Sequence, residues 1–163
     1  MAIATSFKDY LDKQQIRYET VTHPHSSTAM ETALAAGIPM TRLTKSVVFR
    51  DENQHYLMAV LPSQCRAEID KLNALTNHQL TLVDENELAD LFRDCELGAI
   101  PPAGNAYSMT TVWDDKLNGE EEIYVEAGDH EHLLHLSREG FTKLMGRNPH
   151  GSFSRPIIDS SAW

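Results

Sequence analysis

The chain has 163 residues, about the size of one domain, and we expect a single domain over residues 1–163. Its hydrophobic content of 41% and charged content of 23% are close to the averages of soluble globular proteins, which excludes disordered and fibrous classes. The net charge of -10 argues against a broad surface for DNA or RNA, because such surfaces depend on lysine and arginine. A local site for one nucleotide end, or for a small molecule, remains open.

The sequence contains no apolar run that approaches the ~20 residues needed to cross a membrane. Its first residues lack the basic segment and the apolar core of a signal peptide. Cys65 and Cys95 have no CxxC spacing, which fits structural thiols in a reducing compartment. We therefore expect a cytoplasmic protein that does not contact membranes.

The first predicted elements are a short helix and a strand. Phe7, Tyr10 and Leu11 have the i, i+3, i+4 spacing of an amphipathic helix. Ser6 precedes them and is a suitable N-cap, because its hydroxyl can accept a bond from a free amide of the first turn. Residues 17–21 follow with the composition of a strand.

A second helix is predicted between a capping signal and a stop. Thr28 and Glu31 have the spacing of a capping box, and Gly37 is suited to the left-handed residue that ends a helix. The apolar face of this helix is expected to consist of Met30, Ala33, Leu34 and Ala36.

Residues 43–61 predict a β-hairpin, in which two apolar runs flank a polar turn at 51–54. The period of two places Lys45 on the same strand face as three large apolar side chains, those of Leu43, Val47 and Phe49. An unpaired ammonium is costly in that setting. Two interpretations stay open: Lys45 reaches solvent along the sheet edge, or it is a cation at the floor of a pocket.

The second half of the chain alternates helices and strands. Helices are predicted around residues 69–75, after Asp84 and after Ser137, with strands at 80–83, 106–113, 122–127 and 133–136 and a turn at 114–119. Together the elements predict a mixed α/β fold whose central sheet is largely antiparallel and flanked by helices.

The tail at residues 147–163 is rich in glycine, serine and proline. It also carries large apolar side chains at Phe153, Ile157 and Ile158. We expect it to pack on the domain as an extension.

The segment from Gly98 to Gly104 places two glycines around Pro101 and Pro102, with Ile100 as its one large apolar residue. Proline fixes φ and removes a donor, while glycine lets another molecule approach the main chain. The segment predicts a stiff loop with an exposed backbone, suited to binding, although an ordinary connection is the simpler alternative.

Other chemical motifs are few. Histidines occur at 130, 132 and 135 and again at 23 and 25, but no HExxH motif or cysteine partner accompanies them. We predict no metal site and no cofactor, and keep a small metal-binding protein as the alternative. No G-x-S-x-G elbow, phosphate loop or dinucleotide motif is present, so a nucleophilic side chain is not indicated.

Several motifs occur in an order that resembles one family. They are Thr28-Ala29-x-Glu31-x-Ala33, Gly37-Ile38-Pro39, Leu43-Thr44-Lys45-Ser46-Val47-Val48-Phe49, Val60-Leu61-Pro62, Lys71-Leu72, Gly98-x-Ile100-x-Pro102-x-Gly104, Thr111-Val112-Trp113-Asp114-Asp115 and Ala127-Gly128-Asp129-His130. Over roughly residues 5–146 this order resembles the YbaK family, which includes free-standing aminoacyl-tRNA deacylases and the editing domain of bacterial prolyl-tRNA synthetases. The tail at 147–163 lies outside the match.

The resemblance implies a mixed α/β domain with a barrel-like sheet and Lys45 as the active-site lysine. The implied substrate-binding residues are Gly98, Ala99, Ile100, Pro101 and Pro102 of the G-x-x-x-P loop, together with Thr28, Met30 and His130. His130 is a positional candidate for the functional histidine of the synthetase domains. The chain departs from many relatives at Pro101 and Ala103.

The implied reaction is hydrolysis of a mischarged tRNA, with Ala-tRNA(Pro) or another small amino acid on tRNA as the expected substrate. Such an ester is already activated and needs a placed water and oxyanion stabilisation, which agrees with the missing nucleophile. Deacylation of Cys-tRNA(Pro), or a non-catalytic module that binds aminoacyl-tRNA or an amino acid, are the alternatives. The expected partners are the tRNA acceptor end and prolyl-tRNA synthetase or an elongation factor.

Overall fold

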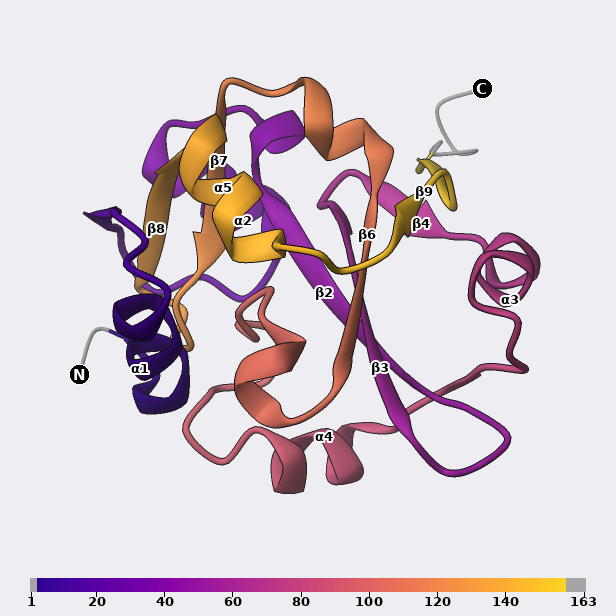
Figure 1. Cartoon of the computed structure of the whole chain (residues 1–163). Helices are drawn as coiled ribbons and strands as arrows, with labels where there is room; N and C mark the ends of the chain where they lie inside the picture. The colour runs from indigo at the N-terminus through magenta and orange to yellow at the C-terminus, as the bar shows by residue number, and fades with distance from the viewer. Residues whose placement is uncertain (1–2, 158–163) are drawn as a thin grey trace.

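The hairpin predicted at residues 43–61 is the centre of the fold in the computed structural model, which describes residues 3–157 (Figure 1). Strand β2 (Thr44–Arg50) pairs antiparallel with β3 (Tyr56–Pro62) along their whole length, from Thr44 opposite Pro62 to Arg50 opposite Tyr56. Every residue of β3 after Tyr56 is buried. This is expected of a strand that has neighbours on both sides and layers on both faces.

The hairpin lies within a five-stranded sheet of order β5-β2-β3-β6-β9. The added strands are β5 (Thr81–Leu82), β6 (Thr110–Asp114) and β9 (His150–Gly151). Strand β5 is antiparallel to β2, whereas β6 runs parallel to β3 and β9 parallel to β6. The predicted antiparallel arrangement therefore holds on the β2 side, and the sheet as a whole is mixed.

A second sheet contains three antiparallel strands in the order β1-β8-β7. These are β1 (Glu19–Thr22), β8 (His132–Ser137) and β7 (Glu122–Glu126), and a further pair joins β10 (Ser154–Pro156) to β4 (Cys65–Ala67). One parallel bridge, Leu43 to Tyr124, connects the start of β2 with β7. The sheets do not close into a barrel, so the barrel-like form that the family resemblance implies is not confirmed.

Helix α2 (Ala29–Ala36) has the predicted cap and stop. Thr28 Oγ1 accepts a bond from Glu31 N–H at 3.1 Å, and Gly37 has φ +70°. Its predicted apolar face is confirmed for Ala33, which is buried with Leu43 and Leu133, and for Ala36, which packs against that cluster. It is wrong for the Met30 and Leu34 side chains, which are 62% and 76% exposed.

Helix α1 (Thr5–Lys13) buries Phe7 and Leu11 completely, as the spacing predicts. The predicted N-cap is wrong, because Ser6 lies inside the helix and the N-cap is Ala4. The Ser6 amide donates instead to Asp94 Oδ2 at 2.8 Å, so a distant carboxylate satisfies one free amide of the first turn.

The other helices are α3 (Ile69–Thr76), α4 (Glu85–Leu91) and α5 (Arg138–Met145). Asp84 and Ser137 cap α4 and α5 through their side-chain oxygens, as predicted. Short 3₁₀ turns occupy Met40–Arg42, Gly104–Tyr107 and Asp115–Gly119. The strand predicted from Ala106 therefore begins later, at Thr110. None of the helices at residues 3–157 has the length and apolar character required to cross a membrane.

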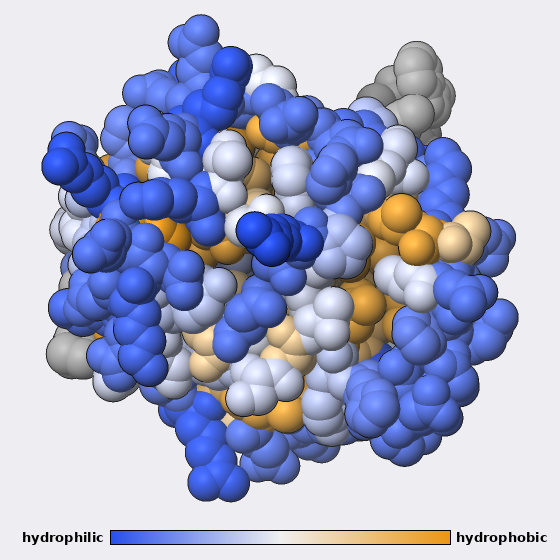
Figure 2. Space-filling view, viewed as in Figure 1, coloured by the Kyte–Doolittle hydropathy of each residue, from blue (hydrophilic) through white to orange (hydrophobic). Residues whose placement is uncertain are grey.

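The five-stranded sheet has an apolar cluster on each face. Val48, Met58 and Val60 face the larger cluster, which also takes in Phe7 and the Ile123 side of the second sheet. The opposite face carries a smaller cluster of Phe49, Leu57, Ala59, Leu61, Cys65, Leu72, Leu80, Val112 and Phe153. Figure 2 shows that polar residues cover most of the visible surface and that apolar residues form only small separate patches there.

The tail packs through Phe153, which is fully buried in the smaller cluster. Its backbone carbonyl accepts a bond from Glu68 N–H at 2.7 Å, and β10 follows it along β4. The predicted packing is confirmed for Phe153. It is wrong for the Ile157 side chain, which is 58% exposed, and Ile158 lies outside the described residues.

We predict that Phe153→Ala lowers the free energy of unfolding by about 3–5 kcal/mol, because the change leaves a cavity in a packed cluster. Ile157→Ala is the matched control in the same segment and should stay within about 0.5 kcal/mol of the parent protein. Urea denaturation followed by circular dichroism measures both. Equal stability of the two variants would show that the tail does not contribute to the core.

Candidate functional site

Lys45 lies on β2 between Leu43 and Val47, which pack against two different apolar clusters. On the same strand face, Leu43 packs under α2, whereas Val47 packs against the smaller cluster of the main sheet. The Lys45 side chain is half-buried, and within residues 3–157 it forms neither a hydrogen bond nor an ion pair. Burial lowers the pKa of its ammonium; the nearby Cys65 opposes this shift and Arg66 adds to it. The site therefore holds a cation without a protein anion.

The loop from Gly98 to Gly104 lies deeper than predicted. Gly98 is exposed, but every residue from Ala99 to Gly104 is buried, and Ile100 and Ala103 belong to the larger core cluster. The expected exposed backbone is therefore wrong beyond Gly98, because the Ile100 and Ala103 side chains draw the loop into the larger core cluster. Within residues 3–157 the amides of Gly98 and Ile100 are among the loop donors that have no acceptor.

His130 lies directly against this loop. Its Nε2 is 2.6 Å from the Leu97 carbonyl oxygen, and its backbone amide donates to Glu96 Oε2 at 2.9 Å. Gly98 has φ +87°, and a Cβ added there would lie 3.1 Å from His130 Cε1. Glycine is thus required at Gly98 both by its backbone conformation and by the approach of the imidazole.

The segment before α2 reaches the same place. Ser26 N–H donates to the His130 carbonyl at 3.1 Å, and the His25 ring lies 5.3 Å from the His130 ring in an edge-to-face arrangement. Thr28 is exposed and uses its hydroxyl as the N-cap, and Met30 projects from the first turn of α2. The structure thus gathers the loop, His130 and the start of α2, whereas no hydrogen bond or ion pair in the described part of the chain joins Lys45 to them.

The sequence analysis missed Glu126, which is 7% exposed on β7. Its Oε1 has no hydrogen-bond partner, and burial, with a smaller contribution from Asp129, raises the pKa of the carboxyl to about 8. Leu43 and Tyr124 form a parallel bridge between the start of β2 and β7. Lys45 and Glu126 each follow their bridge residue by two positions, so they occupy corresponding positions on the two strands. Ile123 and Val125 of β7 face the larger core cluster, so the alternation of the strand puts Tyr124 and Glu126 on the opposite face, toward α2. This pattern could have indicated the Glu126 carboxyl from the sequence.

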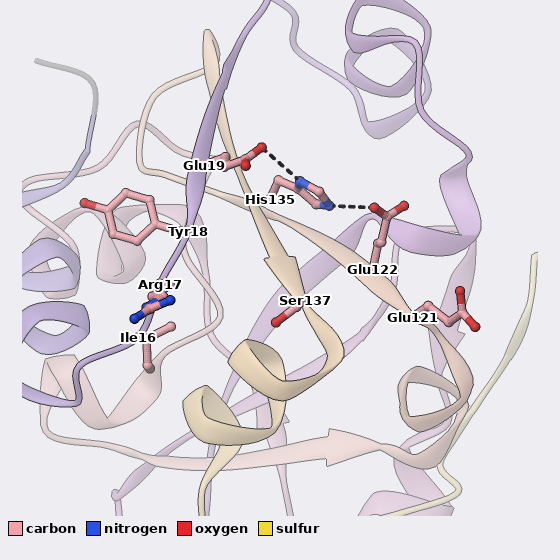
Figure 3. A pocket seen from close by; sticks show the side chains of 8 residues that line it. All are labelled: Ile16, Arg17, Tyr18, Glu19, Glu121, Glu122, His135 and Ser137. Carbon is pink, nitrogen blue, oxygen red and sulfur yellow. Dashed lines mark hydrogen bonds and ion pairs between the residues drawn. The ribbon is translucent and has the colours of Figure 1, made fainter.

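The predicted site residues do not line a cavity of about 790 Å³ that lies at the other end of the second sheet. Figure 3 shows His135 there between two carboxylates, with Nδ1 3.6 Å from Glu19 and Nε2 3.1 Å from Glu122. The charged side chains of this lining include three glutamates, Glu19, Glu121 and Glu122, and one arginine, Arg17. Within residues 3–157, His130, His132 and His135 do not form a group of potential metal ligands.

We predict that Glu126 makes the protein less stable as the pH rises from about 4.5 to about 8. The carboxyl binds its proton more tightly in the folded chain than in the unfolded chain. This contribution to the free energy of unfolding is complete below about pH 4.5 and is lost as the pH rises to about 8. Glu126→Gln should remove this part of the slope, which is at most about 1.4 kcal/mol per pH unit. Urea denaturation at several pH values measures it, with the exposed Glu121→Gln as control. Identical pH profiles for the parent protein and Glu126→Gln would contradict the assignment.

The fold is shared with several solved structures. A candidate trans-editing enzyme for prolyl-tRNA synthetase has a TM-score of 0.81 and 22% identity, with 93% of this chain and 96% of that chain covered. The hypothetical protein APE2540 has a TM-score of 0.81 and 19% identity, with coverage of 92% and 99%. A candidate signal transduction protein of Marinobacter aquaeolei VT8 has a TM-score of 0.74 and 17% identity, and the match covers 96% of this chain but 31% of that longer one.

No curated protein sequence matches the chain significantly. The family model of the aminoacyl-tRNA editing domain matches residues 23–144, which include Lys45, the glycine-proline loop and His130. This range covers most of the chain, so the chain belongs to the aminoacyl-tRNA editing domain family, also known as the YbaK family.

Proposed function

We propose that the chain hydrolyses the ester bond of mischarged tRNA that carries a small amino acid, with Ala-tRNA(Pro) as the first substrate. The observation that carries the proposal is Lys45, a half-buried ammonium without a protein anion in a chain of the editing family. A cation of this kind is stabilised when an anionic group of a ligand reaches it. The 3′ end of a tRNA supplies such a group.

Lys45 acts as an electrostatic anchor in this proposal. It holds the terminal phosphate or the ester end of the substrate, and it stabilises negative charge that develops on the carbonyl oxygen. A water attacks the ester carbon, and a neighbouring ribose hydroxyl orients it. Lys45 is less suited to the role of general base, because a lysine serves as a base at neutral pH only after strong desolvation, and this side chain is only half-buried.

The loop and His130 form the aminoacyl side of the proposed site. In this proposal the free amides of Gly98 and Ile100 donate to the carbonyl oxygen, and the buried, stiff segment of Ala99, Pro101 and Pro102 restricts the size of the aminoacyl side chain. His130 holds the loop through the Leu97 carbonyl. Met30 and Thr28 bound the same region from the start of α2, which supports a pocket that selects by exclusion of larger groups.

The net charge of -10 restricts the contacts that the tRNA can make. We infer that the protein binds the acceptor end alone and works beside prolyl-tRNA synthetase or an elongation factor in the cytoplasm. The likeness to a candidate trans-editing enzyme for prolyl-tRNA synthetase supports this choice of partner.

The selectivity can be measured with a panel of purified tRNAs that carry alanine, cysteine, serine or proline. We expect the fastest deacylation for alanine, slower reactions for cysteine and serine, and no significant reaction for proline, because its ring does not fit the pocket. Prolyl-tRNA that is hydrolysed as fast as alanyl-tRNA would refute the exclusion. Tight binding of the panel without hydrolysis would instead identify a binding module.

The role of Lys45 can be measured with Lys45→Ala and with Lys45→Met, which keeps the length and apolar stem of the side chain. Both variants should deacylate Ala-tRNA(Pro) about 10²- to 10³-fold more slowly, as expected for the loss of one positioned donor. Their thermal stability should be unchanged or increased, because an unpaired ammonium no longer has to be desolvated.

The matched control is Lys13→Ala, which removes an exposed lysine from the end of α1 and should leave the rate unchanged. Full activity in Lys45→Met would exclude the anchoring role. A loss of activity that follows a loss of folded protein in both Lys45 variants would make Lys45 a structural residue.

A further inference from the structure

The turn between β2 and β3 carries a cluster of side chains that the proposed function does not use. Asp51 and Glu52 lie at its start, His55 lies at its end, and His78 approaches from the segment after α3. Single ligand atoms of Asp51, Glu52 and His78 lie within 4.8 Å of one another. Within residues 3–157 no other group of histidine, cysteine and carboxylate side chains gathers as closely.

The backbone orients both carboxylates. Asp51 Oδ1 accepts the amides of Asn53 at 2.8 Å and His55 at 2.9 Å, and Glu52 Oε1 accepts the amide of Gln79 at 2.7 Å. Each carboxylate thus has one oxygen bound to the main chain and the other directed to the cluster. Metal sites use such outer hydrogen bonds to hold their ligands in place.

The Nδ1 atoms of the His55 and His78 imidazoles lie near Asp51 Oδ2, and His78 Nδ1 also lies near Glu52 Oε2. This nitrogen is 2.6 Å from Glu52 Oε2 and 3.8 Å from Asp51 Oδ2, and His55 Nδ1 is also 3.8 Å from Asp51 Oδ2. Zinc bonds nitrogen and oxygen at about 2.0–2.2 Å, so neighbouring ligand atoms of a tetrahedral site lie about 3.3–3.5 Å apart. These three distances each differ from that spacing by less than about 1 Å.

We infer that Asp51, Glu52 and His78, with His55 as the fourth ligand, bind one divalent zinc ion. The ion takes the place of the proton that His78 Nδ1 donates to Glu52, so one proton is released on binding. Two imidazoles and two carboxylates favour zinc over magnesium or calcium, which prefer oxygen ligands alone. A cavity of about 630 Å³, lined by Asp51, His55 and His78, gives the ion access from solvent.

This site is separate from the proposed deacylase site. Asp51 follows Lys45 by six positions of extended chain, a separation of about 20 Å along the strand. The bound ion would link the β2–β3 turn to the segment between α3 and β5, beside the edge of the main sheet. The inference therefore does not depend on the deacylation reaction.

The test uses the full untagged chain, stripped with EDTA and titrated with zinc chloride by calorimetry. We expect one zinc per chain, and His78→Ala and Glu52→Gln should each weaken binding at least about tenfold. Cobalt should give the visible absorption of a tetrahedral ion in the parent protein and lose it in His78→Ala. His132→Ala is the matched control, because that imidazole pairs with Asp129 outside the cluster.

Three results would overturn the site: no saturable zinc binding, unchanged affinity in both cluster variants, or an equal loss in His132→Ala. Equal binding of magnesium would also overturn it, since the imidazoles would then not take part. Circular dichroism shows whether each variant is folded, and if His78→Ala is not, the nearly isosteric Glu52→Gln decides.

Discussion

The structure depends on a strand that has no hydrophilic face. The side chains of β3 are apolar on both sides of the sheet, so folding has to cover both. One face receives α1 and the second sheet, and the other receives α3 and the tail through Leu72 and Phe153. Strand β2 pairs antiparallel with one edge of β3, and β6 pairs parallel with its other edge. The main sheet is therefore mixed in strand direction.

Lys45 is a charged residue on a strand that the apolar core requires, which points to a functional role for its side chain. Its strand is half of the hairpin that the core requires, and its neighbours on that face are apolar. A leucine or methionine there would fit the packing without a desolvation cost. An ammonium that is kept in such a position without a protein partner agrees with selection for a ligand, as the editing family leads one to expect.

The sequence was most informative where a structure depends on neighbours in the chain. Thr28, Gly37, Asp84 and Ser137 were predicted as caps and stops, because capping is a local hydrogen-bond problem. The Ser6 cap, the exposure of Met30 and the depth of the glycine-proline loop were predicted wrongly, since each depends on segments far away in the chain. In the site, alternation placed Lys45 correctly in apolar surroundings and could have placed Glu126 on the α2 side of β7, but no local pattern revealed that His130 contacts Gly98.

The docking of Phe153 has a consequence for synthesis on the ribosome. The smaller cluster brings residues 49–80 together with a side chain about seventy positions later, and β9 adds another late strand to the same sheet. A growing chain therefore exposes the apolar surface of the hairpin until residues 150–156 have left the exit tunnel. Until then the early segments remain incompletely packed, and in this state the exposed apolar surface can bind chaperones or aggregate.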